Sequence, residues 1–479
     1  MSPALQRVVA VALLLWLAAF TFAALDEPIG DGDEQVHATI LRDMLRDGDW
    51  LRPHWDGKPV LERPLLPYWL AAPFSLALPG EAGIRIGSAL ASFATLLVVF
   101  AAARAQWQRC DAALLAALLL AGSPSFHAYS RTLMSDPLLV LGAAIAIAGT
   151  LAARRDPRAL VIAGLGVGLA IAAKSLIAGV PALALAPWWI GPLRAASVRT
   201  RLWAGAALAS LALPYYALMT ALHGGRFLQA HFGLSLAQRA TTSFGFGMQD
   251  GPASYLLWVP SGEGPLTSAW LLLGSAGALI AGLRLRRAEL ALLGGYALGV
   301  FVLMSLLATR LPHYILPAYP AAALGVAGLY VELTARTGFA QRAFAALLAP
   351  ALGLCALLEA RAHPGGYQYL LQRSTSRDLG LVAARVAAPG QTIYLYDWYG
   401  PAIAYYAERP LVMLTQSQHA RGVLSNVMRT AFVPPPPEPP GSALLIVAEP
   451  DALAAASWLR VERVLASSPP ALLARARVR

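Results

Sequence analysis

Acidic and basic side chains that could act in catalysis stand at a few turns of an otherwise apolar chain. Asp33 and Glu34 open a helical pattern, Glu62 and Arg63 precede a proline, and Asp136 precedes another. A carboxylate at a helix N-terminus is stabilised by the helix dipole and free N–H groups, and it can accept a proton or orient a hydroxyl. A guanidinium can bind a phosphate through two parallel hydrogen bonds.

The composition places these side chains in a membrane protein. Of 479 residues, 57% are apolar and only 13% are charged, and the mean hydropathy is +0.56. One soluble core could not hide that much apolar surface from water, and a disordered chain would carry far less of it. Because a bilayer crossing needs about 20 apolar residues, we identify about eleven spans. They are 8–25, 86–103, 112–129, 137–153, 159–173, 176–190, 202–222, 266–283, 290–308, 313–332 and 343–360.

The net charge of +11 is explained by membrane topology rather than by binding to nucleic acid, and no nucleic-acid partner is expected. Arginines gather in short loops between the spans, as in cytoplasmic loops. The five basic loops carry Arg104/Arg109, Arg154/Arg155/Arg158, Arg194/Arg199/Arg201, Arg284/Arg286/Arg287 and Arg336/Arg342. With an odd number of spans, they place the N-terminus inside an inner (plasma) membrane and the C-terminal region outside. The first span lacks a small-residue cleavage site and is interpreted as a retained helix.

The opposite set of loops carries charges that topology does not explain. These are Asp33, Glu34, Glu62, Arg63, Arg131, Asp136, Lys174 and Arg310. Lys174 is one of only two lysines in the chain, the other being Lys58. Cations on the outer side oppose the usual orientation bias, so they require another role.

The first outer loop, 26–85, is expected to contain helices that lie on the membrane surface. Apolar residues recur at helical spacing between Val36 and Leu45. Asp33 stands where an N-cap is expected, and Gly48 stands where the helix should stop. A second interfacial element is expected over 64–78, and the polar, Gly-rich loop 223–265 is expected to fold over the bundle.

The chain changes character after residue 360. Short β-rich runs at 392–397, 410–415 and 443–448 alternate with helical stretches at 377–387, 401–407 and 416–429. This pattern predicts a small extracytoplasmic α/β domain over 361–479, following a mainly α, polytopic membrane domain over 1–360. Cys110 and Cys355 lie far apart and support neither a disulfide framework nor a zinc site. No cofactor is indicated with certainty, although paired acids could hold a divalent cation.

Several motifs follow one another in an order known from one protein family. They are Asp33-Glu34-Gln35-Val36-His37-Ala38, Gly48-Asp49-Trp50, Glu62-Arg63-Pro64-Leu65-Leu66-Pro67-Tyr68-Trp69, Arg131 through Asp136-Pro137-Leu138, Ala172-Ala173-Lys174-Ser175, His231-Phe232 through Arg239, and Arg310-Leu311-Pro312-His313-Tyr314-Ile315-Leu316-Pro317. The series resembles the GT-C superfamily of membrane glycosyltransferases, in particular the group of protein O-mannosyltransferases and the lipid A aminoarabinose transferase. In this chain Arg63 and Arg310 stand where the family has lysines. The resemblance covers residues 1 to about 332.

The resemblance implies the GT-C fold and a transferase that uses a polyprenyl-phosphate-linked sugar at the extracytoplasmic face. The sugar would pass, with inversion, to a lipid A-like glycolipid, a protein or an envelope glycan. The catalytic candidates are Asp33 as the first choice of base, Asp136 as the second, and Glu34. The donor-phosphate candidates are Arg63, Lys174 and Arg310, together with Glu62. The substrate-binding candidates are Tyr68, His313, Tyr314, Arg131 and Arg239.

Simpler structural roles account for each of these residues taken alone. Asp33 and Asp136 could cap helices, and Glu62–Arg63 could be a surface pair of little energetic weight. The cations at 174 and 310 could reach the interface from helix ends, and the tyrosines and His313 could be interfacial anchors. Two other functions compete with transfer. A transporter or flippase would bury its charges near the bilayer midplane, and a non-catalytic subunit would only bind sugar.

Overall fold

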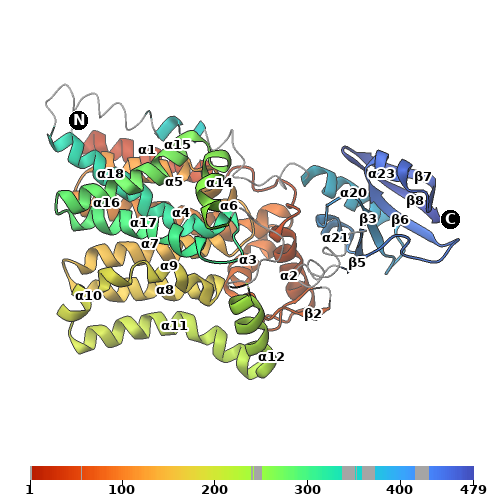
Figure 1. The fold of residues 1–479 in the computed structure, drawn as a ribbon, viewed down its shortest axis with the longest axis horizontal. Coiled ribbons are helices and arrows are strands. Elements are labelled where there is room, and N and C mark those ends of the chain that lie inside the picture. Colours follow the sequence, from red (N-terminus) through yellow and green to blue (C-terminus); the bar gives the residue numbers. More distant parts are fainter. Residues whose placement is uncertain are drawn as a thin grey trace. The chain divides into compact units, whose positions relative to one another are not determined.

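The chain forms two compact units, seen in a computed structural model that describes residues 3–55, 57–238, 241, 251–336, 351, 353–355, 357–358, 373–415 and 431–479. The first unit contains Met1–Leu25, Leu61–Pro79 and Gly83–Gly366, and the second contains Asp26–Val60, Gly80–Ala82 and Tyr367–Arg479. Figure 1 shows long helices in the first and a sheet in the second. The segment that follows the first helix thus belongs to the same unit as the C-terminal residues. The boundary predicted at 361 lies outside the described residues.

The described part of the first unit contains seven helical segments long and apolar enough to cross a bilayer. They are α4 (Glu81–Trp107), α7 (Asp136–Ala153), η1 with α8 (Pro157–Ala159, Leu160–Lys174), α11 (Val198–His223), α15 with η5 and α16 (Pro265–Ser268, Ala269–Gly274, Ser275–Arg284), α17 (Ala288–Ser305), and η6 with α18 (Pro312–Ala318, Tyr319–Arg336). Two bent pairs raise the total to as many as nine. The first pair is α5 (Cys110–Ala121) with α6 (Pro124–Ser130), and the angle between the two helices is 73°. In the second pair, η2 (Leu176–Ala178) and α9 (Gly179–Leu183) together precede α10 (Ala186–Ala195), and the angle is 78°.

These segments confirm the predicted polytopic, mainly α architecture. The seven helical segments and the two bent pairs coincide with nine of the predicted runs. The run 8–25 corresponds to α1 (Pro3–Thr21), and most of the run 343–360 lies outside the described residues. The other elements of this unit are α3 (Leu66–Ala77), α12 (Gly225–Leu228), η3 (Gln229–Gln238), η4 (Gly251–Ala253) and α14 (Ser254–Gly262).

Helices α7 and α8 pack backbone against backbone. A Cβ added to Gly142 of α7 would lie 2.6 Å from the carbonyl oxygen of Gly166 in α8, and one added to Gly166 would lie 2.4 Å from the nitrogen of Ala146. Small residues allow such approach between helices in an apolar medium, where packing drives association. The contact fixes how the start of α7 meets the end of α8.

The second unit is built on a six-stranded mixed sheet in the order β5-β4-β3-β6-β8-β7. Its strands are β3 (Ile393–Tyr396), β4 (Leu411–Leu414), β5 (Ala431–Val433), β6 (Ala443–Ala448), β7 (Leu459–Ser468) and β8 (Ala471–Val478). Strands β5, β4, β3 and β6 are parallel, whereas β8 is antiparallel to both β6 and β7. The three predicted strands and the helices predicted at 377–387 and 401–407 are confirmed, whereas β5, β7 and β8 were missed. The predicted helix 416–429 lies outside the described residues.

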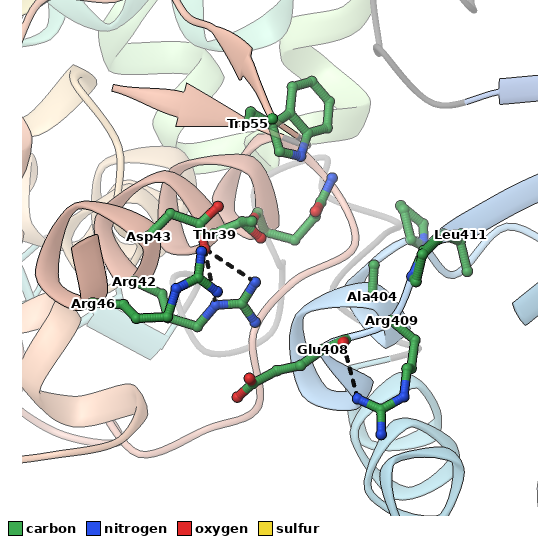
Figure 2. Close-up of a pocket in the computed structure, with 13 residues that line it drawn as sticks. Thr39, Arg42, Asp43, Arg46, Trp55, Ala404, Glu408, Arg409 and Leu411 are labelled. Atoms are coloured by element: carbon green, nitrogen blue, oxygen red, sulfur yellow. Dashed lines mark hydrogen bonds and ion pairs between the residues drawn. The ribbon is translucent and has the colours of Figure 1, made fainter. Parts of the chain in front are cut away.

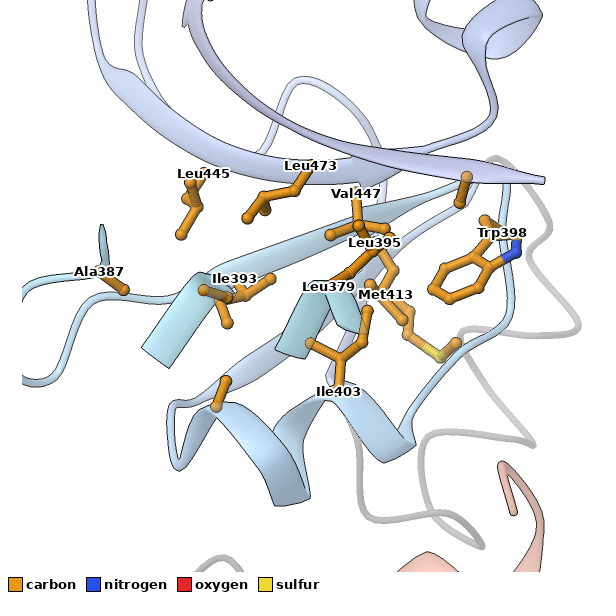
Figure 3. Packing of buried hydrophobic residues seen from close by; sticks show 13 residues of the cluster. Leu379, Ala387, Ile393, Leu395, Trp398, Ile403, Met413, Leu445, Val447 and Leu473 are labelled. Atoms are coloured by element: carbon orange, nitrogen blue, oxygen red, sulfur yellow. The ribbon is translucent and has the colours of Figure 1, made fainter. Parts of the chain in front are cut away.

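Alternating side chains give this sheet two apolar faces. Ile393 and Leu395 of β3 pack against Leu379 of α20 (Arg373–Val386) and Ile403 of α21 (Ala402–Ala407), as Figure 3 shows. The intervening Tyr394 packs on the opposite face, against a cluster that includes residues of α23 (Pro450–Ala455). Both faces are therefore covered, as expected for parallel strands.

The early part of the second unit consists of α2 (Asp33–Asp47) and a small hairpin, β1 (His54–Trp55) with β2 (Lys58–Pro59). The helix stops at Gly48 as predicted, with φ at 70° and its N–H donating to the carbonyl of Met44. The N-cap position belongs to Gly32 rather than Asp33, so the prediction that Asp33 caps this helix was wrong. Glu34, Gln35 and His37 are buried, so α2 is enclosed by protein along most of its length.

A buried carboxylate joins this early segment to the C-terminal helices. Asp31 is 1% exposed, and it accepts hydrogen bonds from the Ser376 hydroxyl, at 2.9 and 2.8 Å, and from the Ala402 N–H at 2.8 Å. Nearby, the Tyr406 hydroxyl accepts a bond from the Ile29 N–H at 2.7 Å. Residues more than 340 positions apart in the chain are therefore held together by charged and neutral hydrogen bonds.

We expect Asp31→Ala to destabilise the second unit, because hydrogen bonds to a charged group contribute about 1.5–3 kcal/mol each. In detergent, trypsin should cleave at arginines of 373–479 faster in this variant than in the wild type. Asp26→Ala, at an exposed position a few residues earlier, is the control and should leave the cleavage rate unchanged. Equal rates in all three proteins would contradict this role of Asp31.

Candidate active site

The candidate residues from the sequence are divided between the two units. Asp33 and Glu34 belong to the second unit, whereas the candidates at positions 62, 63, 136, 174 and 310 belong to the first. Within the first unit, direct contacts bring together Asp136, Lys174 and Tyr314.

The ion pair between Asp136 and Lys174 is the centre of this cluster. Lys174 Nζ lies 2.6 Å from Asp136 Oδ1, and the two side chains are 16% and 0% exposed. Asp136 is the first residue of α7, but Ser135 holds the N-cap position and no side-chain capping bond forms. The carboxylate therefore does not cap its helix. Its second oxygen, Oδ2, is buried without a hydrogen-bond partner in the described structure.

An aromatic ring lies beside the ammonium group of this pair. Lys174 Nζ is 5.2 Å from the ring centroid of Tyr314, a distance at which a cation is attracted to the ring face. Tyr314 and its neighbour His313 lie in η6 and are buried. The hydroxyl of Tyr129, in α6, shares a hydrogen bond of 2.9 Å with His313 Nδ1. Helix α7 and η6 thus both contact Lys174, and α6 contacts η6 through the Tyr129–His313 bond.

Arg310 lies on the short loop that leads into η6. Its Nη1 donates to the carbonyl of Leu307 at 2.6 Å, while its Nε is buried without a hydrogen-bond partner in the described structure. The next carbonyl, that of Leu311, accepts a hydrogen bond of 3.1 Å from the Tyr255 hydroxyl. Hydrogen bonds therefore hold the loop at both Arg310 and Leu311. The Nε–H of Arg310 remains available to donate to a ligand.

The segment that carries Glu62 and Arg63 is fixed through one backbone carbonyl. The oxygen of Leu61 accepts from the Tyr215 hydroxyl at 3.1 Å and from His231 Nδ1 at 3.3 Å. Because a carbonyl only accepts, Nδ1 carries the proton, and Nε2 can accept from the Tyr216 hydroxyl at 3.2 Å. His231 is 1% exposed, and burial lowers its pKa against the smaller opposing effects of the Leu61 carbonyl and Glu62.

A buried glutamate that the sequence analysis did not single out supports α6. Glu263 is fully buried at the end of α14. Its carboxylate accepts from the N–H of Ser125 at 3.2 Å and from the hydroxyl of the same residue. Free N–H groups in the first turn of a helix favour such an anion. Glu263 thereby positions the helix that presents Tyr129.

The remaining candidates lie at separate places. Glu34 Oε2 accepts a hydrogen bond of 2.8 Å from the Gly30 N–H, so it stabilises the turn before α2. Tyr68 is fully buried on α3, and Arg131 follows the last residue of α6. Arg239 lies outside the described residues. Among the described residues, no group of three or more His, Cys, Asp or Glu side chains is arranged to hold a metal ion.

Comparisons with known proteins agree with this architecture. Residues 58–219 match the family model described as dolichyl-phosphate-mannose-protein mannosyltransferase. An undecaprenyl phosphate-alpha-4-amino-4-deoxy-L-arabinose arabinosyl transferase of Edwardsiella ictaluri is 29% identical over 332 residues. That match covers 65% of this chain and 57% of the relative, so the chain spans just over half of the relative's length.

Two solved structures share the fold. ArnT from Cupriavidus metallidurans, solved with undecaprenyl phosphate bound, superposes with a TM-score of 0.71 at 20% identity, covering 99% of this chain and 98% of that one. The oligosaccharyltransferase of Archaeoglobus fulgidus gives a TM-score of 0.53 at 16% identity, covering 84% and 62%. These similarities confirm the GT-C fold of a multi-pass membrane protein and the resemblance found in the sequence.

The buried histidine generates a prediction about acid stability. An unfolded histidine has a pKa of about 6.5, and the folded value of His231 is lower, so the unfolded state binds more protons below that pH. Stability that is present above pH 6.5 is therefore lost as the pH falls towards the folded pKa. We expect the melting temperature in detergent to drop between pH 7.5 and 5.5, and to drop less in His231→Gln. His54→Gln is the control, and an identical acid response of all three proteins would contradict the assignment.

Proposed function

We propose that this chain, which has the GT-C fold, is a membrane glycosyltransferase that takes a sugar from a polyprenyl-phosphate carrier at the extracytoplasmic face. The proposal is supported by the relative named as an undecaprenyl phosphate-aminoarabinose arabinosyl transferase and by the fold shared with ArnT. The observation that carries it is the partly buried Lys174, paired with the fully buried Asp136 and placed beside the ring of Tyr314. The acceptor is a lipid A-like glycolipid, a protein or an envelope glycan.

In this reaction the bond between the anomeric carbon and the phosphate oxygen breaks as the acceptor oxygen bonds to that carbon. The leaving polyprenyl phosphate gains negative charge in the transition state. A cation fixed in a water-poor site stabilises that charge without reorganisation. Lys174 supplies such a cation, and Arg310, with its buried Nε donor, is the second candidate.

The role of Asp136 follows from its contact with Lys174. A carboxylate that already accepts from an ammonium at 2.6 Å is a poor proton acceptor, because losing its charge would leave the ammonium without its counter-charge. We therefore assign Asp136 as a positioning residue for Lys174 rather than as the second choice of base. Asp33 stays the proposed base for a hydroxyl acceptor, and a phosphate acceptor would need none.

The position of the charges also bears on the transport alternative. Asp136 is the first residue of α7 and Lys174 is the last of α8. Both charges therefore lie at helix ends, whereas a transporter concentrates them near the midplane on interrupted helices. This arrangement favours chemistry near one membrane surface.

Transfer from undecaprenyl-phosphate-aminoarabinose to lipid A by the purified full chain tests the proposal. Lys174→Met should lower kcat/KM about 100- to 1000-fold, the usual loss when one donor to a developing negative charge is removed. Lys174→Arg, which keeps the charge, should retain more activity. Lys58→Met, at the only other lysine and exposed, is the matched control and should behave as the wild type.

Two measurements keep the outcome decisive. Removing only one partner of a buried ion pair destabilises a protein by about 3–5 kcal/mol, and unfolding would also abolish activity. The double variant Lys174→Met/Asp136→Leu leaves no unpaired charge, and its folding is compared with that of the wild type by size-exclusion chromatography. A folded, inactive double variant supports the assignment, and full activity of any Lys174→Met protein overturns it. If wild-type protein transfers no sugar from any polyprenyl phosphate but moves such lipids across vesicles, the protein is a flippase.

A further inference from the structure

A hollow lies within the second unit, among residues that the proposed reaction does not use. Its volume is about 260 Å³, close to the lower limit of about 300 Å³ for small-ligand pockets. It lies between one face of α2, the β1–β2 hairpin, and the chain from α21 to β4. Figure 2 shows residues of these three elements around the hollow.

One face of α2 lines the hollow with polar groups at helical spacing. Gln35, Thr39, Asp43 and Arg46 follow one another at intervals of three or four residues, and Arg42 completes the row. Burial raises the pKa of Asp43, although both arginines oppose the effect. This row offers amide, hydroxyl, carboxylate and guanidinium groups, so it can donate and accept hydrogen bonds along its whole length.

The arginines of this row already have partners. Arg42 Nε lies 3.4 Å from Asp43 Oδ1, and its Nη1 donates to the carbonyl of Tyr405 at 2.7 Å. Arg46 Nε lies 2.8 Å from a carboxylate oxygen of Asp47. The third arginine of the hollow, Arg409, donates to the backbone carbonyls of Ala387, Ala388 and Glu408. Because each guanidinium already has acceptors within the protein, the hollow does not select for a bare anion. It suits a ligand with many hydroxyl groups, each able to donate and to accept.

The other two walls add an aromatic surface and an acid. Trp55, on β1, is partly exposed and lines the hollow. A tryptophan ring combines a large apolar surface with a polar N–H, and the apolar face of a pyranose ring can pack on it. Glu408 ends α21 in the left-handed conformation, with φ at 51°. Figure 2 shows its side chain extending from α21 towards the arginines of α2.

We propose that this hollow binds one sugar unit of the acceptor, stacked on Trp55 and hydrogen-bonded to α2 and Glu408. The assignment to the acceptor rests on the proposed function, since the residues assigned to the donor phosphate all belong to the other unit. The binding of sugar itself rests only on the residues of the hollow. Its chemistry is that of a neutral or amino sugar rather than a free phosphate.

Calorimetry on the detergent-purified full chain tests binding without any turnover. The probes are disaccharides of glucosamine, mannose and arabinose, and inorganic phosphate. At least one disaccharide should bind, and Trp55→Ala should weaken its binding about tenfold, the change that 1.4 kcal/mol produces. Trp50→Ala, in the same loop but outside the hollow, is the matched control. Binding of phosphate alone, or of no sugar, overturns the proposal.

Steady-state kinetics then tests the assignment to the acceptor. Trp55→Ala and Glu408→Gln should raise KM for the acceptor about tenfold while KM for the polyprenyl-phosphate donor and kcat stay unchanged. A rise in the donor KM instead would overturn the assignment. If the wild type shows no transfer but binds sugar through Trp55, the proposed function fails and the sugar site stands.

Discussion

A carboxylate fully enclosed in an apolar helical bundle constrains everything around it. Leaving Asp136 charged without a partner there would cost several kcal/mol, so Lys174 has to meet it at the end of the neighbouring helix. That meeting requires α7 and α8 to approach closely along their length, which the glycines at 142 and 166 permit. The ammonium is consequently held at one place, at the junction of two helix ends and beside an aromatic ring.

Short polar contacts hold the loops around this pair in the same manner. The Leu61 carbonyl accepts hydrogen bonds from Tyr215 and His231. The first turn of α6 donates hydrogen bonds to the buried carboxylate of Glu263. In each case a loop or helix end has backbone groups that lipid could not satisfy. A side chain from a distant helix satisfies them, and so positions the functional residues next to them.

The second unit combines a segment near the N-terminus with the C-terminal α/β fold. Asp31 makes the connection through Ser376 and Ala402. As a result, the polar row of α2 faces α21 across the hollow. The same helix carries the candidate base Asp33 in its first turn. Residues 26–60, which the sequence analysis assigned to the membrane domain, thus belong to the unit that contains the C-terminal α/β fold.

The sequence by itself determined the membrane class, the positions of the described spans and three of the six strands of the sheet, because apolar length and alternation are local properties of the chain. It also singled out Asp136 and Lys174 by type and by their places at helix ends. It did not find β5, which has only three residues, β7, whose mostly exposed residues show no alternation, or β8. It also did not find the partnership of Asp136 with Lys174. Only the tertiary structure decided the Asp136–Lys174 ion pair, the hydrogen bonds to the Leu61 carbonyl and the polar hollow beside Trp55. Each of these features depends on which helix faces and loop ends pack together. Such packing brings together residues far apart in the chain, and their spacing in the sequence does not reveal it.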